Sequence, residues 1–343
     1  MSKNKTYVIA EMSANHNGDF DRAISIIHAM KEAGADAVKL QTYTADTLTI
    51  DCDKPDFIIG EGTIWKGQRL HDLYANAFTP WEWHAELFAV ASELGMDCFS
   101  TPFDNTAVDF LEQFNPPAYK VASFELVDIG LIEYIASKGR PIIMSTGMGT
   151  LEEISDAVDV VKNAGVPLTL LKCTSAYPSP PSSMNLKTMA DLAERFDVAV
   201  GLSDHTLGTT VPVAAVAMGA TVVEKHFTLS RADEGPDSTF SLEPAEFREM
   251  VDAIRVVEQA IGEVKYERSE KEKASVVFRR SLYAVEDIAA GETLTRENVR
   301  SIRPGHGIKP KFLKTLLGKK AATSISRGTP ISAEVVESFE ADE

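Results

Sequence analysis

Residues 198–228 read VAVGLSDHTLGTTVPVAAVAMGATVVEKHFT, and this stretch decides the fold. Two short apolar runs, Val198–Leu202 and Thr221–Val223, each end in ionisable residues, which are Ser203-Asp204-His205 and Glu224-Lys225-His226. A helical segment of small residues lies between them. In α/β folds the strand interiors are apolar, and ligands bind beyond the carboxyl ends of the strands. The stretch therefore predicts two neighbouring parallel strands that place His205 and His226 in one pocket.

The rest of the chain repeats this pattern of a strand followed by a helix. With the opening pair, the strand-like runs lie at Thr6–Ser13, Ala37–Tyr43, Asp97–Phe103, Ala118–Ser123, Pro141–Thr146, Leu168–Ser175, Val198–His205 and Thr221–Thr228. Eight such units in roughly 260 residues are the number and length of a (β/α)8 TIM barrel. A doubly wound open sheet is the alternative, but it favours a G-x-G-x-x-G turn, which the sequence lacks.

The pattern changes after the last amphipathic helix, predicted at Pro244–Ile261. Tyr266–Ser275 reads YERSEKEKAS and is almost free of apolar residues, which predicts an exposed linker. The tail beyond it has short β-like pieces and frequent glycines. We therefore predict a catalytic domain over residues 1–265, a linker over 266–278 and a small β-rich domain over 279–343.

The composition limits the kind of partner. The formal net charge is −17, which argues against nucleic acid, since that ligand requires a basic surface. The sequence contains no apolar run of about 18 residues and no apolar leader at its start, so we expect a cytoplasmic protein without a membrane segment. Three cysteines without motif spacing agree with a reducing compartment.

Polar residues stand at the ends of the predicted strands. Since strand side chains alternate between faces, Lys39 and Gln41 share a face, and so do Glu224 and His226. The strand-end residues are Glu11, Lys39, Gln41, Thr101, Lys120, Ser123, Ser145, Lys172, Ser175, Ser203 and the two histidine clusters. We expect Lys39, Lys120 and Lys225 to converge on a bound phosphate or carboxylate, with the hydroxyls of Ser123, Ser145 and Ser203 as further donors. The alternative is that a single lysine extends to solvent.

The two histidines indicate a metal. As a pair at the ends of adjacent strands, His205 and His226 leave positions open for water and a substrate oxygen. Glu11 would complete the coordination directly or through water. Mixed nitrogen and oxygen ligands suit Mn²⁺ or another divalent ion such as Mg²⁺ or Co²⁺. The alternative for each histidine is a buried side chain whose hydrogen bonds are satisfied.

The segment Glu61–His84 contains the three tryptophans of the chain. A long loop of this kind either packs on its own aromatic residues, which we expect for Trp81 and Trp83, or forms a wall of the substrate site.

Motifs along the whole chain resemble those of the sialic acid synthases. The matching stretches are IAEMSANHNGD, VKLQTYT, FSTPFD, YKVASFE, STGM, KCTSAYPSP, GLSDHT, EKHFT, EGPDSTFSL, RRSLYAVEDIAAGE and RPGHGIKPKF. Members of that family are TIM-barrel enzymes with a C-terminal antifreeze-like (SAF) domain. Within the family, SFE after YKVA, the DFIIGEGTIWKG loop and TPWEWH look most like the pseudaminic acid branch. Neuraminate and legionaminate synthases are the alternatives, with a different hexosamine acceptor.

The resemblance implies a reaction and a role for each site residue. Family members condense phosphoenolpyruvate with the open-chain aldehyde of an N-acylated hexosamine. It implies that Glu11 and Glu125 are acid/base residues and that His205 and His226 are metal ligands. The residues matched to phosphoenolpyruvate binding are Lys39, Ser123, Ser145, Ser175 and Ser203, with Lys120 at the same mouth, and those matched to the sugar are Gln41, Thr101, Tyr177 and Asp237. It also implies a domain-swapped homodimer, in which Arg303 of the SAF domain reaches the partner subunit's barrel.

Two rival functions remain open at this point. A class I aldolase would form a Schiff base on Lys120 or Lys172 and would need no metal. Alternatively, the tail is a binding module for ice or carbohydrate, and the barrel is its scaffold.

Overall fold

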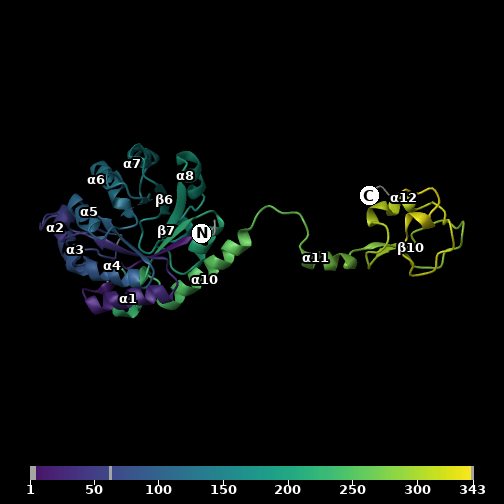
Figure 1. Ribbon diagram of the computed structural model, residues 1–343, viewed down its shortest axis with the longest axis horizontal. Coiled ribbons are helices and arrows are strands. Elements are labelled where there is room, and N and C mark those ends of the chain that lie inside the picture. Colours follow the sequence, from purple (N-terminus) through teal and green to yellow (C-terminus); the bar gives the residue numbers. More distant parts are fainter. Residues whose placement is uncertain (1–4, 62–63, 341–343) are drawn as a thin grey trace. The chain divides into compact units, whose positions relative to one another are not determined.

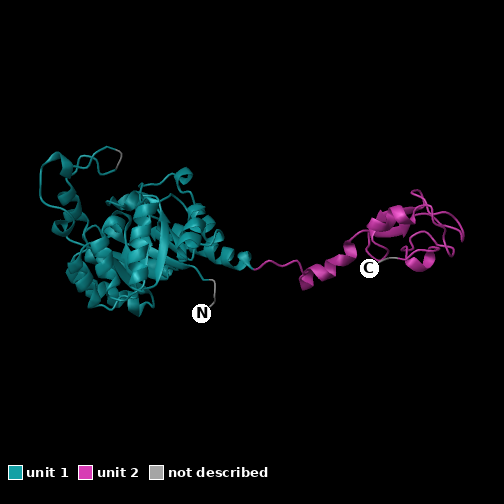
Figure 2. Cartoon of the chain, turned by 90° about the horizontal axis from the view of Figure 1, so that it is seen from above, with its two compact units in different colours: residues 1–262 teal, residues 263–343 magenta. Residues whose placement is uncertain are grey.

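The computed structural model describes residues 5–61 and 64–340 of the chain. The chain divides into two compact units, residues 1–262 and residues 263–343, which are coloured separately in Figure 2. The first unit contains the strand–helix repeats, and the second contains the tail.

Within the described part of the first unit, eight parallel strands form one sheet in the order β3-β2-β1-β8-β7-β6-β5-β4. β3 and β4, at the two ends of this order, also contact each other, so the sheet curls into a barrel. The strands are β1 (Tyr7–Glu11), β2 (Ala37–Thr42), β3 (Asp97–Pro102), β4 (Tyr119–Val121), β5 (Ile142–Ser145), β6 (Leu168–Cys173), β7 (Ala199–Asp204) and β8 (Val222–His226). Each lies within a predicted run, and the TIM-barrel prediction is confirmed.

Helices surround the sheet, as Figure 1 shows. Those that follow the strands are α1 (Phe20–Glu32), α4 (His84–Glu93), α5 (Asn105–Glu112), α6 (Ile129–Ala136), α7 (Leu151–Asn163), α8 (Thr188–Phe196), α9 (Thr210–Ala217) and α10 (Pro244–Ile261). The insertion after β2, for which the sequence predicted no regular structure, contains the short helices α2 (Ala45–Leu48) and α3 (Leu70–Ala77).

Local sequence explains where these elements begin and approach one another. α7 starts at a capping box, in which Thr150 and Glu153 satisfy each other's free backbone N–H groups. Gly201 in β7 has no Cβ, and one built there would lie 2.3 Å from the carbonyl oxygen of Val222 in β8. A larger residue would therefore separate these two strands, which carry Ser203 and Glu224.

Alternation along the strands divides the apolar residues into two layers. One layer fills the barrel interior and includes Ile9, Phe99, Leu171 and Val222. The other packs between the strands and the surrounding helices. Every strand residue two positions from an interior residue faces the same interior, and this relation determines which polar side chains enter the mouth.

The tail unit has a small core of its own, which includes Leu282, Leu294, Val299 and Ile331. In its described part, regular strands are limited to the antiparallel pair β9 (Ser281–Ala284) and β10 (Val299–Ile302), extended by isolated bridges. α12 (Leu313–Leu316) is a short helix of this unit. The predicted linker contains α11 (Glu270–Ser275), because Ser269 and Glu272 form a capping box. Across the described residues, no helix is both long enough and apolar enough to cross a membrane.

Candidate active site

The polar side chains of the mouth continue the interior face of the barrel. Lys39 follows Ala37 by two positions, Lys120 follows Ala118, and Ser145 follows Ile143, and each first residue belongs to the interior layer. The same spacing brings in Glu11, Gln41, Thr101, Cys173, Ser203, Glu224 and His226. The alternation used in the sequence analysis therefore places these side chains in one mouth.

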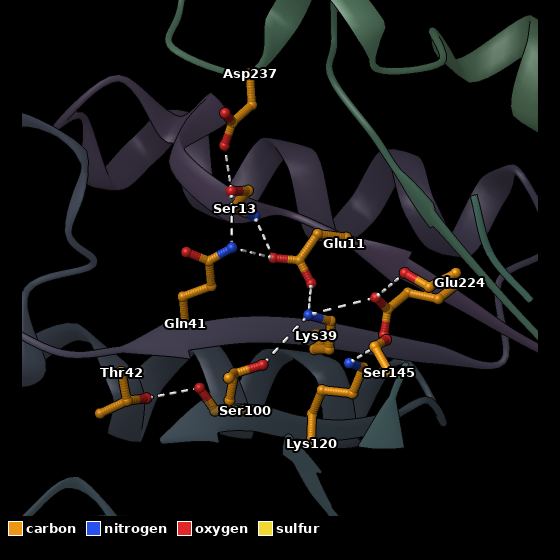
Figure 3. Close-up of polar contacts among 12 residues, drawn as sticks. Glu11, Ser13, Lys39, Gln41, Thr42, Ser100, Lys120, Ser145, Glu224 and Asp237 are labelled. Atoms are coloured by element: carbon orange, nitrogen blue, oxygen red, sulfur yellow. Dashed lines mark hydrogen bonds and ion pairs between the residues drawn. The ribbon is translucent and has the colours of Figure 1, made fainter. Parts of the chain in front are cut away.

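Lys39 lies at the centre of this mouth, between two carboxylates (Figure 3). Its Nζ lies 2.5 Å from Oε2 of Glu11 and 3.7 Å from Oε1 of Glu224, and it donates a 3.3 Å hydrogen bond to Thr101. Burial alone would lower the pKa of Lys39, but the two carboxylates raise it above its ordinary value. The two carboxylates therefore favour the charged form of Lys39 in this buried site.

Glu11 is held in place by Ser13, Gln41 and Lys39. Its Oε1 accepts hydrogen bonds from the side-chain amide of Gln41 at 3.1 Å and the backbone N–H of Ser13 at 3.1 Å. Burial raises the pKa of Glu11 to about 7, with Lys39 opposing the shift and Glu224 adding to it. A carboxyl group with this pKa exchanges a proton near neutrality, as an acid/base residue requires.

A second buried lysine, Lys120, lies in another part of the mouth. Lys120 donates hydrogen bonds to Ser145 at 2.7 Å and to the carbonyl oxygen of Val121 at 2.8 Å, both neutral groups. Burial lowers its pKa, and Glu224 partly opposes this. Glu224 in turn accepts a 3.0 Å hydrogen bond from Ser203, and its Oε2 has no hydrogen-bond partner among the described residues. Glu224 is thus bonded to Ser203 and lies within the electrostatic influence of Lys120.

Two serine hydroxyls meet at Gly147. Ser123 accepts a 3.1 Å hydrogen bond from the N–H of Gly147, and a Cβ at Gly147 would lie 2.4 Å from the Ser175 hydroxyl and 2.7 Å from that of Ser123. The Ser175 oxygen is buried without a partner in the described chain. A glycine at this position therefore keeps open a small cradle of hydroxyl groups suited to anionic oxygens.

The two histidines lie as the sequence predicted, with ring centroids 5.3 Å apart. Nδ1 of His205 lies 3.1 Å from the carbonyl oxygen of Thr174, which can only accept, so in the neutral ring Nε2 carries the lone pair. Nδ1 of His226 is buried and makes no hydrogen bond to a described residue, and burial lowers its pKa well below its ordinary value. These two imidazoles fit a divalent metal ion.

Glu11 does not form a direct three-ligand set with the two histidines. Its oxygens are engaged by Lys39, Gln41 and Ser13. No set of three His, Cys, Asp or Glu side chains in the described chain has an arrangement that would hold a metal. A metal at His205 and His226 would therefore take its remaining ligands from water and substrate.

The matched sugar positions fall in two places. Gln41 donates a 3.0 Å hydrogen bond to Ser13, which donates to Asp237, so this row reaches from the barrel to the loop after β8. Tyr177 lies on the other side of the mouth, with its ring 4.3 Å from that of His205. Thr101 accepts from Lys39, which puts it at the anion end of the mouth.

The tryptophans separate into two groups. Trp81 packs on Phe110, and Trp83 packs on His16 and Phe20, as expected for aromatic residues that anchor the segment. Trp65 instead lies 5.7 Å from the ring of Tyr177 and donates a 3.2 Å hydrogen bond to the carbonyl oxygen of Pro236. It is therefore the tryptophan that borders the mouth.

Glu125 lies beyond the end of β4, in the 3-10 turn Ser123–Val127. Its Oε2 is buried without a hydrogen-bond partner in the described structure, and burial raises its pKa to about 7 while Lys120 and Lys39 oppose the shift. Both acid/base candidates thus have a pKa near neutrality. Arg303 belongs to the tail unit, where it is exposed directly after β10.

Two lysines that the sequence analysis assigned to strand ends face away from the barrel. Lys225 lies between the interior residues Glu224 and His226, so alternation points it outward, where it forms an ion pair with Asp204 at 2.6 Å. The expectation that it joins the anion site was wrong. Lys172 follows the outward residue Leu170 and donates to the carbonyl oxygen of Cys173 at 2.5 Å. It is therefore not placed to act as a Schiff-base lysine in the mouth.

Sequence reasoning placed Glu224 at the mouth but gave it no role, and it missed Ser13 altogether. The place of Glu224 followed from alternation, because it precedes His226 by two positions on the same strand and shares its face. Ser13 gave no such signal, since it lies in a turn and its partner Asp237 is 224 residues away.

Comparison with known proteins agrees with this geometry. The NeuB family profile matches residues 26–266, and the SAF domain profile matches residues 279–337. The chain is 49% identical over 325 residues to pseudaminic acid synthase of Campylobacter jejuni, covering 94% of each chain. It is 45% identical over 333 residues to pseudaminic acid synthase of Helicobacter pylori, covering 96% of this chain and 97% of that one.

A solved structure gives the same result for the fold. The N-acetylneuraminic acid (sialic acid) synthetase of Leptospira borgpetersenii superposes with a TM-score of 0.71 at 28% identity. The match covers 80% of this chain and 90% of that one.

Proposed function

The chain belongs to the NeuB family and carries a SAF domain, and from this premise we propose that it is a pseudaminic acid synthase. The proposed reaction condenses phosphoenolpyruvate and water with 2,4-diacetamido-2,4,6-trideoxy-L-altrose, giving a nine-carbon 2-keto sugar acid and phosphate. The observation that carries the proposal is the pair of buried lysines, Lys39 and Lys120, at the mouth of an otherwise apolar barrel.

The proposed binding mode assigns the anionic substrate to the lysine side of the mouth. Phosphoenolpyruvate carries a carboxylate and a phosphate, and Lys39 and Lys120 supply one positive charge for each. The hydroxyls of Ser123, Ser145, Ser175 and Ser203 supply neutral donors around them. Charge-assisted hydrogen bonds of this kind fix orientation as well as affinity.

The acceptor sugar would lie between the aromatic side and the Gln41–Ser13–Asp237 row. Tyr177 and Trp65 offer apolar surface there, and Gln41 and Asp237 offer polar contacts. Thr101, which resembles a sugar-contacting position, would reach the acceptor from the anion end of the mouth. When bound at His205 and His226, Mn²⁺ or a similar ion would supply Lewis-acid polarisation of the sugar aldehyde.

Proton transfer falls to the two glutamates. Glu11 and Glu125 both titrate near neutrality because they are buried, so either can accept a proton from the attacking water and later return one. The high pKa of each carboxyl group supports this role without choosing between them. We further propose that Arg303 completes the site from the partner subunit in a domain-swapped homodimer.

A phosphate-release assay with three acceptors tests the proposal. Phosphoenolpyruvate is supplied with N-acetylmannosamine, with the precursor of legionaminic acid, or with the altrose derivative. We expect release to be fastest with the altrose derivative, and a preference for N-acetylmannosamine would refute the assignment. Release that survives EDTA, together with borohydride trapping of a keto acid on Lys120, would favour the aldolase instead.

Metal dependence is tested separately. We expect EDTA to abolish activity, Mn²⁺ to restore it, and His226→Ala to weaken Mn²⁺ binding as measured by electron paramagnetic resonance. A His226→Ala enzyme with normal Mn²⁺ affinity would contradict the assignment of His226 as a ligand. Removal of residues 276–343 should abolish activity if Arg303 has the proposed role.

A further inference from the structure

A cavity of about 490 Å³ lies outside the barrel, behind the serine cradle. It is bounded by the loop between β5 and α7, the end of β6, the helix α7 and the start of α8. The residues that line it are Thr146, Met148, Gly149, Ile154, Lys172, Cys173, Asn185, Leu186, Lys187 and Thr188.

Strand alternation separates this cavity from the mouth. On β6, Leu171 belongs to the barrel interior, whereas Leu170 belongs to the layer between strands and helices. Lys172 follows Leu170 by two positions and therefore faces the helices. Lys172 and the mouth thus lie on opposite sides of β6, and Cys173, which lines the cavity but follows the interior residue Leu171 by two positions, marks where the two spaces adjoin.

The charge of the cavity is positive in a strongly acidic chain. Its lining contains Lys172 and Lys187 but no Asp or Glu, and within residues 5–61 and 64–340 neither lysine forms an ion pair. Lys172 is partly buried and donates only to neutral oxygens, those of Cys173 at 2.5 Å and Thr174 at 3.3 Å. A half-buried ammonium group without a counter-ion favours an anionic ligand.

The other lining residues and the volume of the cavity indicate that the ligand also has an apolar, hydrogen-bonding organic part. Met148, Ile154 and Leu186 provide apolar surface, and Thr146, Asn185 and Thr188 provide hydrogen-bonding groups. Met148 is 60% exposed and has a backbone φ of 62°, a conformation that is costly for a large side chain. A water molecule occupies about 30 Å³, and a phosphate ion is the size of a few waters. The cavity is several times larger than that, so it has room for a phosphate and an organic group.

We propose that this cavity binds a phosphate monoester with a small organic body, such as a sugar phosphate, at a site distinct from the mouth. Lys172 and Lys187 would pair with the phosphate, and the organic body would lie against Met148, Ile154 and Leu186.

The bound molecule would act on the mouth through residues 146–149. One side of this loop lines the cavity, and on its other side the N–H of Gly147 donates to Ser123. The space for a Cβ at Gly147 is already taken by the hydroxyls of Ser123 and Ser175, so a shift of the loop toward the cradle would displace them. Occupancy of the cavity should therefore change the affinity of the serine cradle.

Calorimetric titration of the full-length protein tests the site, with ribose 5-phosphate, inorganic phosphate and ribose as probes. We expect ribose 5-phosphate to bind more tightly than inorganic phosphate, and ribose not to bind. Lys172→Met and Lys187→Ala should each weaken binding of ribose 5-phosphate by about tenfold, the value of one charge-assisted contact. Lys187 is exposed, so its variant is not expected to disturb folding.

Two control variants locate the binding. Lys120→Met removes a charge from the mouth, and Lys162→Met removes an exposed lysine of α7 that does not line the cavity. Both should leave binding of ribose 5-phosphate unchanged. Loss of binding in Lys120→Met alone would place the probe in the mouth and overturn the proposal, as would equal binding by ribose.

The coupling has a separate readout. Ribose 5-phosphate should change the KM for phosphoenolpyruvate in the unmodified protein and not in Lys187→Ala. An unchanged KM at saturating ribose 5-phosphate would overturn the coupling. Because the titrations use no substrate of the proposed reaction, their outcome is independent of the proposed function.

Discussion

Lys39 and Lys225 form similar ion pairs on opposite faces of the same barrel. Lys39 meets Glu11 at 2.5 Å on the inner face, and Lys225 meets Asp204 at 2.6 Å on the outer face. Both pairs are almost fully buried, with side-chain exposures of 5% or less. Distance and burial alone would therefore assign them the same role.

Their surroundings differ in what remains unsatisfied. Lys225 also donates to the carbonyl oxygen of Thr206, and Asp204 accepts from the N–H and hydroxyl of Thr206, so this pair is closed. Lys39 is shared between Glu11 and Glu224, and Glu224 keeps a buried oxygen without a partner in the described chain. A closed pair stabilises the strand ends that carry the histidines, whereas an open one has capacity left for a ligand.

The largest effect on stability should come from breaking the closed pair. We expect Lys225→Met to lower the free energy of unfolding by about 3–5 kcal/mol, because it leaves Asp204 as a buried charge without a partner. Chemical denaturation followed by circular dichroism measures this. The double variant Asp204→Leu, Lys225→Met removes both charges and should recover most of the loss. If Lys225→Met were as stable as the unmodified protein, the closed pair would not differ from the open one in its contribution to stability.

Breaking the open pair of Lys39 and Glu11 should lower the catalytic activity more than the stability. We expect Lys39→Met to lower kcat/KM by about 10²–10³, the typical cost of removing one preorganised donor from an active site. Its stability should fall less than that of Lys225→Met, because Glu11 already has a pKa of about 7 and can take up a proton. Phosphate release and denaturation on the same sample separate the two effects. A Lys39→Met enzyme with normal turnover would show that Lys39 has no role in the active site.

Glu125 has a further buried oxygen without a partner in the described structure, and the effect of this residue on stability should depend on pH. Burial raises its pKa in the folded state from about 4.5 to about 7, so between these values the folded state holds a proton that the unfolded state has lost. Stability therefore falls as pH rises through this window. Glu125→Gln cannot ionise and should be more stable than the unmodified protein by on the order of 3 kcal/mol at pH 8, and by little at pH 4.5. Denaturation at both values checks this, and an equal difference at each would contradict it.

The same contrast shows how far the sequence could predict this site. The alternation of strand side chains correctly placed Lys39, Lys120, Ser145, Ser203 and the histidines in one mouth, since it depends only on backbone geometry. The same rule should have excluded Lys225, which lies between two interior residues of β8. Our prediction followed residue type rather than position, and was wrong for that reason.

Other features depended on contacts that no local pattern reveals. The bond from Ser13 to Asp237 and the approach of Ser123 and Ser175 to Gly147 join separate strand–helix units. The insertion was predicted to be irregular because its short helices follow weak signals: α2 has only four residues, and Arg69 before α3 makes no side-chain cap. The positive cavity behind the cradle also required the structure, because its lining comes from the loop after β5, the end of β6, α7 and the segment that leads into α8.

The smallest effect is expected for an ion pair of similar geometry on the surface. Arg195 and Asp191 on α8 lie 2.9 Å apart, four residues apart in the helix, with side-chain exposures of 46% and 55%. Water and salt screen such a pair, and its attraction is offset by the entropy lost on ordering two long side chains. We expect Asp191→Ala to leave the midpoint of thermal unfolding unchanged within error, at low and at high salt. A shift as large as that of Lys225→Met would mean that distance, rather than burial and the satisfaction of each charge, determines what an ion pair contributes in this fold.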